Sequence, residues 1–258
     1  MRKLLKSIYK NLLPRRLRLA FDIFPMLRTY NLPNNLLAEK KIVIIAPHPD
    51  DEIIGCGGAI HICHRRKAEI TAVFMTDGRK GNDKYKEDEL VIIRRREAQK
   101  AGEIIGIDKM IFLDNKDSEL SLSSKTVSEL LTILSDIKPE AVFIPFFLDN
   151  HIDHITTNKI FFSVIKSLRP LMCYSYGFWT ILPYFNLNVD ITPYIDIKRI
   201  ALKEYTSQLE TYDYIDAAIG LSKYYSLHPG GRRLNGWSEV FFVCRSNEYQ
   251  KILIAAGW

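Results

Sequence analysis

The stretch KIVIIAPHPDDE, residues 41–52, decides the fold and carries the first candidate chemistry. Its first seven residues are rich in β-branched side chains, which is typical of a fully buried strand. An imidazole and two adjacent carboxylates follow directly, from His48, Asp50 and Asp51. Ligands of a parallel sheet bind beyond the carboxyl ends of its strands. We therefore expect these side chains at the functional edge of the sheet.

Strand-like and helix-like segments alternate outward from this stretch. Helices are expected at residues 53–67, 89–106, 124–137 and 153–168, and further strands at 69–76, 110–113, 141–145 and 172–177. The alternation predicts right-handed β-α-β units, and hence an α/β, Rossmann-like, mainly parallel sheet flanked by helices. The last eighty residues are less regular, with a helix expected at 198–210 and a closing strand at 239–245.

The composition is that of a soluble globular protein. Of 258 residues, 47% are hydrophobic and 26% charged, which excludes a disordered chain. No apolar run approaches the ~20 residues that a membrane-spanning helix needs. The four cysteines form no C-x-x-C pair and no dense framework, so structural disulfides are not expected. A reducing, cytoplasmic location is the corresponding expectation.

The net charge of +6 is concentrated at the N-terminus. Residues 1–28 hold eight basic side chains and one acidic one, whereas the other 230 residues sum to −1. A nearly neutral body argues against a nucleic-acid partner, which needs a positive field across the surface. Lys6 and Lys10 interrupt the apolar stretch, so a signal peptide is not favoured. We expect a basic amphipathic helical segment at residues 1–39, before a single α/β domain at 40–258.

Two locations for the amphipathic segment stay open. Its apolar face could lie in an anionic membrane interface, which would place the protein peripherally at the inner membrane face. Alternatively, the segment packs on the protein's own body with its basic side chains in water.

A second cluster of histidines and acids follows the strand expected at 141–145. It reads NHIDH, and its two histidines, His151 and His154, are spaced to share one face of a helical turn. The loops after the first and fourth strands of a parallel sheet can be neighbours at a switch point. Several buried acids in one place indicate a metal or a proton-transfer role. The alternative is that Asp50 and Asp153 are helix N-caps beside incidental histidines.

These two motifs resemble those of the PIG-L/LmbE-like zinc-dependent N-acetyl-sugar deacetylases. The family's opening motif is intact as PHPDDE at residues 47–52, and its H-x-D-H motif is intact as HIDH at 151–154. Weaker matches are TDG at 76–78, a helix with Arg94, Glu97, Ala101 and Gly106, DSEL at 117–120 with Ser in place of Gly, and KEYTSQ at 203–208. The resemblance covers residues 40–245.

The resemblance implies a zinc ion with three protein ligands, His48, Asp51 and His154. Asp50 would be the general base, and His151, oriented by Asp153, the electrophile or general acid. These roles agree with the chemistry of amide cleavage. Zinc lowers the pKa of its water to about 7 and polarises a carbonyl, and a nearby carboxylate can take the water's proton. A charged imidazole can stabilise the oxyanion and protonate the leaving amine.

Three further side chains are assigned to substrate binding: Arg94, Asp77 and Glu97. For Arg94 and Glu97, the alternatives are bracing of the metal-binding loops or an ordinary solvated helix face. For Asp77, the alternative is a role in shaping its own loop and supporting the site.

The expected reaction is zinc-dependent hydrolysis of the acetamide of an N-acetylglucosamine-type sugar, which releases acetate and a free amino sugar. The basic segment favours a surface-glycan or glycolipid precursor as substrate over a small soluble glycoside of the thiol-precursor or antibiotic type. A non-catalytic sugar- or lipid-binding module stays open as an alternative. So does a nucleotide-dependent transferase that uses the glycine-rich turn at residues 55–58, although this turn lacks the third glycine of a dinucleotide fingerprint.

Three further histidines are weaker candidates. His61 and His64 share a helix face but lie well beyond the loop that carries the motif. His228 lies in a glycine-rich loop that could border the pocket.

Overall fold

The computed structural model describes residues 36–228 and 235–257. The helices expected within residues 1–28 lie outside this part of the chain. One mixed sheet of seven strands has the order β3-β2-β1-β4-β5-β7-β6. Its strands are β1 (Lys41–Ala46), β2 (Glu69–Thr76), β3 (Lys109–Asn115), β4 (Ala141–Pro145), β5 (Met172–Tyr176), β6 (Leu187–Asp190) and β7 (Ser238–Arg245). The predicted α/β class with a mainly parallel, helix-flanked sheet is confirmed.

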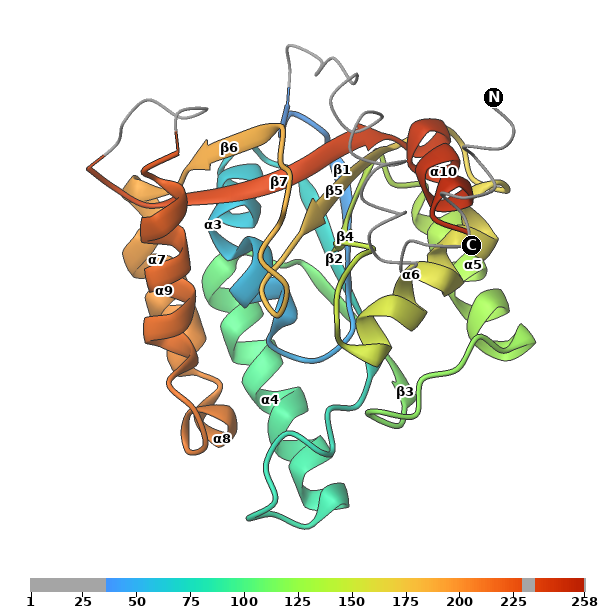
Figure 1. Ribbon diagram of the computed structural model, residues 1–258. Helices are drawn as coiled ribbons and strands as arrows, with labels where there is room; N and C mark the ends of the chain where they lie inside the picture. Colours follow the sequence, from blue (N-terminus) through green and yellow to red (C-terminus); the bar gives the residue numbers. More distant parts are fainter. Residues whose placement is uncertain (1–35, 229–234, 258) are drawn as a thin grey trace, which may run out of the picture.

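Helices cover both faces of the sheet (Figure 1). On one face lie α3 (Asp51–Arg65), α4 (Glu87–Ile105), α7 (Ile195–Lys203) and α9 (Tyr214–Tyr225), and on the other lie α5 (Ser124–Ile137), α6 (Ile152–Ile165) and α10 (Ser246–Ala255). A short helix, α8 (Thr206–Leu209), and a 3-10 turn, η1 (Thr192–Tyr194), complete the described elements. None of the described helices is both long and apolar enough to cross a membrane.

The strand order has a switch point between β1 and β4. The chain builds outward from β1 through β2 to β3, and then returns to place β4 on the other side of β1. Both neighbours pair with β1 in parallel, Ile44 opposite Ala72 in β2 and opposite Phe143 in β4. The loops after β1 and β4 therefore open at the same point of the sheet edge. This confirms the expected juxtaposition of the two motifs.

The glycine-rich turn of α3 serves close packing. A Cβ on Gly55 would lie 2.2 Å from the ring of Tyr176, and one on Gly58 would lie 2.6 Å from Ile191. Two positions on one helix thus admit only glycine at the observed separation. The same helix buries Cys56 and Cys63, as expected of core residues, and all four cysteines of the chain are free.

The C-terminal region departs most from expectation. The helix expected at 198–210 is two helices, because the backbone at Tyr205 is non-helical and its phenol is buried against Glu52. The closing strand β7 is present but runs antiparallel to both β5 and β6. The sequence did not predict β6, α9 and α10, because the apolar residues in these segments are too irregularly spaced to indicate a strand or a helix.

A buried ion pair ties this region to α3. The ammonium of Lys198 in α7 lies 2.6 Å from Oε1 of Glu239 in β7, and it also donates to the carbonyl of Ile54, at 2.8 Å. The carboxylate of Glu239 in turn accepts from the backbone N–H groups of Gly58 and Ala59. The buried ammonium and carboxylate are thus paired with each other and hydrogen-bonded to the backbone of α3, which offsets the cost of burying their charges.

Candidate metal centre and active site

Three side chains of the two motifs converge on one point. Oδ2 of Asp51, at the start of α3, lies 3.2 Å from Nδ1 of His48 and 3.2 Å from Nε2 of His154. His48 comes from the loop after β1 and His154 from the first turn of α6. All three side chains are at least nine-tenths buried. The three residues that the family resemblance implies as ligands are therefore brought together.

The second nitrogen of each imidazole is held by another carboxylate. Nε2 of His48 lies 3.1 Å from Asp153, and Nδ1 of His154 lies 3.1 Å from Asp149. A carboxylate at one ring nitrogen fixes the proton there and leaves the lone pair of the other nitrogen free, which is the usual arrangement around metal-binding histidines. In both rings, the nitrogen left free is the one that faces Asp51.

The carboxylate of Asp153 thus differs from its expected role. It contacts His48 and the backbone N–H of Ser118, at 2.7 Å, whereas the hydrogen bond of His151 to this residue is from the backbone N–H of Asp153 to Nδ1. His151 is the N-cap of α6, so its ring turns back over the helix start while the Asp153 side chain points into the site. The side chain of Asp153 therefore contacts His48, and its contact with His151 is made by the backbone N–H.

The donor set fits a metal ion. Two groups that could hold a metal ion share residues with the proposed ligands but do not include Asp51: ligand atoms of His48, His151 and His154 lie within 4.8 Å of one another, as do those of His48, Asp117 and Asp153. Nε2 of His154 is buried and makes no hydrogen bond, and the ligand atom that faces it is Oδ2 of Asp51 at 3.2 Å. Burial opposes ionisation of Asp51, but the two imidazoles hold its pKa well below the usual range. Imidazole and carboxylate ligands are those that zinc takes in catalytic sites.

Asp50 lies beside this centre in a strained conformation. Its φ of 131° falls in a region that only glycine adopts readily, and the residue is the N-cap of α3. Burial raises the pKa of Asp50 to about 7, although the Arg94 guanidinium at 2.8 Å from Oδ2 opposes this rise. A carboxylate with a pKa near neutrality is matched to general-base work.

Arg94 fastens the loop after β1 to the loop after β2. Besides Asp50, its guanidinium donates to the carbonyl of Pro49 and to that of Gly78, the latter at 2.9 Å. Gly78 has a φ of +67°, and a Cβ there would lie 2.4 Å from Nη1 of Arg94. The glycine of the TDG motif is therefore required both for its backbone conformation and for the close approach of the arginine.

Glu97 and Glu52 brace the walls of the site from behind. The carboxylate of Glu97 accepts from the hydroxyl of Thr206 and from both the amide and hydroxyl of Ser207, and so holds α8 against α4. Glu52 accepts from the backbone N–H of Asp50, at 3.0 Å, and from the Tyr205 hydroxyl. A cavity of about 220 Å³ lies beside His48 and Asp50, and neither glutamate is among the described residues that line it. Bracing is therefore the role that the contacts of Glu97 support.

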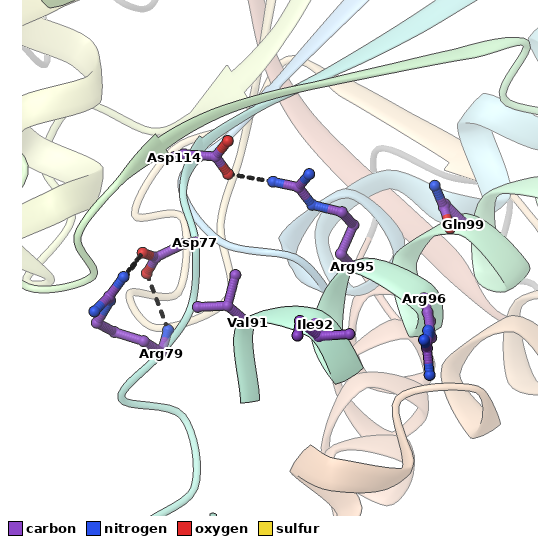
Figure 2. Close-up of a pocket in the computed structure, with 8 residues that line it drawn as sticks. All are labelled: Asp77, Arg79, Val91, Ile92, Arg95, Arg96, Gln99 and Asp114. Carbon is purple, nitrogen blue, oxygen red and sulfur yellow. Dashed lines mark hydrogen bonds and ion pairs between the residues drawn. The ribbon is translucent and has the colours of Figure 1, made fainter. Parts of the chain in front are cut away.

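Asp77 also lies outside that cavity. It accepts from the backbone N–H of Asp117, at 3.2 Å, and pairs with Arg79 at 2.8 Å. Figure 2 shows these two side chains at the edge of a separate hollow of about 440 Å³ beside α4, where Arg95 reaches Asp114. Its contacts place Asp77 in support of the Asp117 loop. Asp117 itself lies 3.3 Å from Nε2 of His48.

A cavity of about 220 Å³ opens directly onto the candidate centre. Its lining comes from both motifs, from the loops after β2 and β3, from α4 and from the C-terminal half: His48, Asp50, Lys80, Gly81, Arg94, Asp117, Ser118, His151, Trp179, Gln208, Tyr212 and Tyr214. Sequence reasoning did not find Asp149 or the aromatic residues. The sequence could have pointed to Asp149, because this carboxylate stands two residues before His151 of the second motif. The aromatic side chains follow β5 and α8 without any motif.

The other candidate histidines lie away from the centre. His61 packs its ring on His64 and Tyr194, and its Nδ1 meets the carbonyl of Ile105 at 3.1 Å. The His228 ring packs against Phe185 and two tyrosines of α9. None of the three lines the cavity among the described residues.

Comparison with known proteins identifies the family. Residues 43–165 match the model of the PIG-L family, described as GlcNAc-PI de-N-acetylase. The matched region carries both motifs and the whole candidate centre, so the chain contains a PIG-L family domain, and its relatives include deacetylases. The resemblance read from the sequence is thereby confirmed.

Individual relatives support the same class. The chain is 29% identical over 189 residues to diacetylchitobiose deacetylase of Thermococcus kodakarensis, covering 66% of this chain and 70% of the relative. A solved structure of N,N'-diacetylchitobiose deacetylase from Pyrococcus horikoshii is 26% identical, with a TM-score of 0.73 over 89% of this chain and 93% of that one. These relatives support a hydrolase that acts on N-acetyl groups.

The fold by itself is shared more widely. The structure of GalB, a 4-carboxy-2-hydroxymuconate hydratase from Pseudomonas putida, is 18% identical, with a TM-score of 0.66 over 79% of this chain and 95% of that one. Function must therefore be argued from the site.

Proposed function

We propose that the protein is a zinc-dependent deacetylase that hydrolyses the acetamide of an N-acetylglucosamine-type sugar. The observation that carries the proposal is the position of Asp51 Oδ2, 3.2 Å from one nitrogen of each of two imidazoles whose other nitrogens are held by acids. His48, Asp51 and His154 would hold the zinc ion. When bound, zinc polarises the amide carbonyl and makes water acidic enough to lose a proton near neutral pH.

The remaining roles fall to two groups at the cavity floor. Asp50 Oδ2 accepts the proton of the attacking water and then donates it to the nitrogen of the leaving amine, and Arg94 holds this carboxylate in place. His151 accepts the backbone N–H of Asp153 at Nδ1, so its neutral ring carries the proton on Nε2. That N–H is available to stabilise the oxyanion that develops when the acetamide is attacked. Burial and the neighbouring imidazoles lower the pKa of His151, which favours this neutral donor over the charged imidazole that the sequence suggested.

Acetate release from N-acetyl sugars, measured with and without added zinc, tests the proposal. We expect turnover that a chelator abolishes and zinc restores. Asp50→Asn and His154→Ala should each lower kcat by at least about 100-fold, the usual contribution of a general base or an activating group. Asp136→Asn, at an exposed site on α5, and His61→Ala are the matched controls. Wild-type turnover by Asp50→Asn, or turnover that persists without metal, would contradict the proposal.

We further propose that the substrate is a surface-glycan or glycolipid precursor that the enzyme meets at an anionic membrane surface through residues 1–28. Support comes from their net charge of +7, because each basic residue near such a surface contributes about 1 kcal/mol. Deletion of residues 1–28 should weaken binding to vesicles of phosphatidylglycerol and phosphatidylcholine. It should leave turnover of a soluble N-acetyl sugar nearly intact. Equal vesicle binding by the shortened protein would refute this part of the proposal.

A further inference from the structure

The basic side chains of the folded body gather at one end of the sheet. Each connection from a helix to the next parallel strand lies at this end, the upper one in Figure 1. The segments concerned are 36–41, which leads into β1, the connections 65–69, 105–109, 137–141 and 165–172, and the turn 245–246 after the antiparallel β7. They hold ten basic and four acidic side chains, whereas the other described residues hold 16 basic and 25 acidic ones. We call this end of the molecule the basic pole.

The basic side chains of the pole are exposed, and acids do not neutralise them. Among the described residues, Lys41 is the only one of the ten that forms an ion pair, with Glu69 at 3.9 Å. Nζ of Lys40 instead donates to the carbonyl of Arg66, at 2.6 Å. Basic residues at helix C-termini stabilise the helix dipole, but this does not account for Lys41 and Lys109, which begin strands. The pole therefore presents uncompensated positive charge to its surroundings.

Two hollows in the pole place cations beside apolar side chains. Lys138 lines one hollow of about 220 Å³ and Arg245 the other, of about 300 Å³, while Arg169 and Leu171 line both. The guanidinium of Arg169 also donates to the carbonyl of Lys138, which holds it between the hollows. Glu140 is the one acid among the described residues that line them. Cations beside apolar surface match a bilayer surface, where anionic phosphates overlie the acyl chains.

The chain that precedes the described residues indicates which partner meets the pole. Residues 1–28, with a net charge of +7, precede Leu36, which leads into β1 at the basic pole. Like charges on the segment and on the pole cannot neutralise each other, so both favour one extended anionic surface. Basic residues beside an anionic bilayer each add to its binding. We propose that the basic pole of the folded body docks on an anionic lipid bilayer, and that the active site faces away from it.

This docking fixes the orientation of the active site. His48 follows β1 at the opposite end of the sheet, and the six residues of β1 span about 20 Å. The cavity beside His48 therefore opens toward water, at about this distance from the pole. A lipid-anchored substrate then reaches the site only if its N-acetyl sugar is carried on an extended glycan. This consequence for the substrate rests on the proposed function, whereas the docking itself does not.

Vesicle binding by the full-length protein tests the docking surface. The triple change Lys138→Gln, Arg169→Gln and Arg245→Gln should lower partitioning onto vesicles of phosphatidylglycerol and phosphatidylcholine about 10- to 100-fold. An unchanged unfolding midpoint shows that the variant is folded, since all three side chains are exposed. Partitioning equal to that of wild type would overturn the inference.

A second triple variant controls for net charge. Lys86, Lys116 and Lys125 are exposed at the opposite end of the sheet, before α4, after β3 and in the first turn of α5. Their replacement by Gln removes the same charge, yet this variant should partition like wild type. Equal losses in the two triple variants would show that total charge acts without a docking face, and would overturn the inference.

Dye-labelled cysteines test the orientation. The four native cysteines are buried, so a thiol-reactive dye should attach to Ser167→Cys at the basic pole or to Ser121→Cys at the active-site end, both exposed positions. Quenchers on the lipid headgroups should quench the dye at Ser167→Cys strongly and the dye at Ser121→Cys weakly. Equal quenching, or the reverse order, would overturn the inference. Neither measurement needs turnover, so a protein that docks in this way without releasing acetate would refute deacetylation alone.

A second copy of the chain is the competing partner, because the rest of the described body carries the excess of acids. Analytical ultracentrifugation distinguishes the two partners. We expect the same oligomeric state for wild type and for the triple variant of the pole. Self-association that this triple change abolishes, without vesicle binding by wild type, would overturn the bilayer as the partner.

Discussion

The guanidinium of Arg94 lies 2.8 Å from Oδ2 of Asp50, across the gap between the loops after β1 and β2. The arginine is 2% exposed, and its Nη1 and Nη2 groups also donate to the backbone carbonyls of Gly78 and Pro49. The position and the protonation of the proposed base thus depend on a side chain 44 residues away. Arg94, which the sequence assigned to substrate, also lines the cavity, so the two roles are compatible.

Replacing Arg94 should alter the pH dependence of the reaction. Burial raises the pKa of Asp50 to about 7, and Arg94 is the largest influence that lowers it. The base works when ionised, so activity is lost as the pH falls through its pKa. In Arg94→Gln the opposing cation is gone, the pKa rises further, and the acid limb of the kcat/KM profile moves to higher pH. We also expect a loss of about 100-fold at the optimum, from misplacement of the base.

Two variants sharpen this measurement. Arg94→Lys keeps the positive charge but lacks the planar guanidinium that donates to several acceptors at once. Its acid limb should therefore lie close to the wild-type pH, while its kcat/KM at the optimum stays lower than that of wild type. Arg95→Gln, whose arginine pairs with the exposed Asp114, should resemble wild type in both. An unshifted limb in Arg94→Gln would contradict the assignment of Asp50 as the base.

Asp149 should matter for metal affinity, although it is not a proposed ligand. Its carboxylate holds Nδ1 of His154 and also accepts from the amides of Asn150 and His151. In Asp149→Asn, zinc affinity should fall about 10- to 100-fold, the usual effect of losing such a partner. Competition with a chelating dye measures the change, with Asp136→Asn as control. Unaltered affinity in a folded variant would show that His154 needs no such orientation.

Gly78 should tolerate no side chain. In Gly78→Ala, the φ of +67° and the 2.4 Å approach to Arg94 both become unfavourable. We expect a loss of about 1–3 kcal/mol in the free energy of unfolding, together with lower activity. Gly220→Ala in α9 is the control, because a Cβ there meets nothing within 4 Å. That change should stabilise the helix by about 0.5–1 kcal/mol. Equal unfolding midpoints for the two variants would count against this account.

The pair of Lys198 and Glu239 should behave as a coupled unit. Lys198→Met leaves a buried carboxylate without its cation and should cost about 3–5 kcal/mol in the free energy of unfolding. The double change Lys198→Met with Glu239→Gln should recover part of this loss, because it removes the unpaired charge and its amide oxygen can still accept from one of the two backbone N–H groups. Urea denaturation of both single variants and the double variant gives the coupling. Simple additivity would mean that the two side chains act independently.

The sequence predicted the strands and helices whose hydrophobic pattern is regular over a short stretch of chain. The run at 41–47 became β1, and its polar continuation met the HIDH motif because the order of parallel strands brings the loops after β1 and β4 together. The partner of Asp153 could not be predicted, since it depends on how the N-cap of α6 turns the His151 ring. Nor could the break at Tyr205, where a buried contact with Glu52 overrides helix propensity. Trp179 carries no motif, and only the folded chain reveals its position at the cavity mouth.

The contact of Lys198 and Glu239 with α3 also limits how this family's domain can be used as a module. The segment 43–165 contains every residue of the proposed metal centre, yet the amides of Gly58 and Ala59 in α3 bond to a carboxylate supplied by β7. Excised alone, it would leave these groups unsatisfied and uncover the helix face that α7 now covers. Engineering by shuffling or transplantation must therefore keep β7 in the same piece as α3, because Glu239 supplies the acceptor for the amides of Gly58 and Ala59.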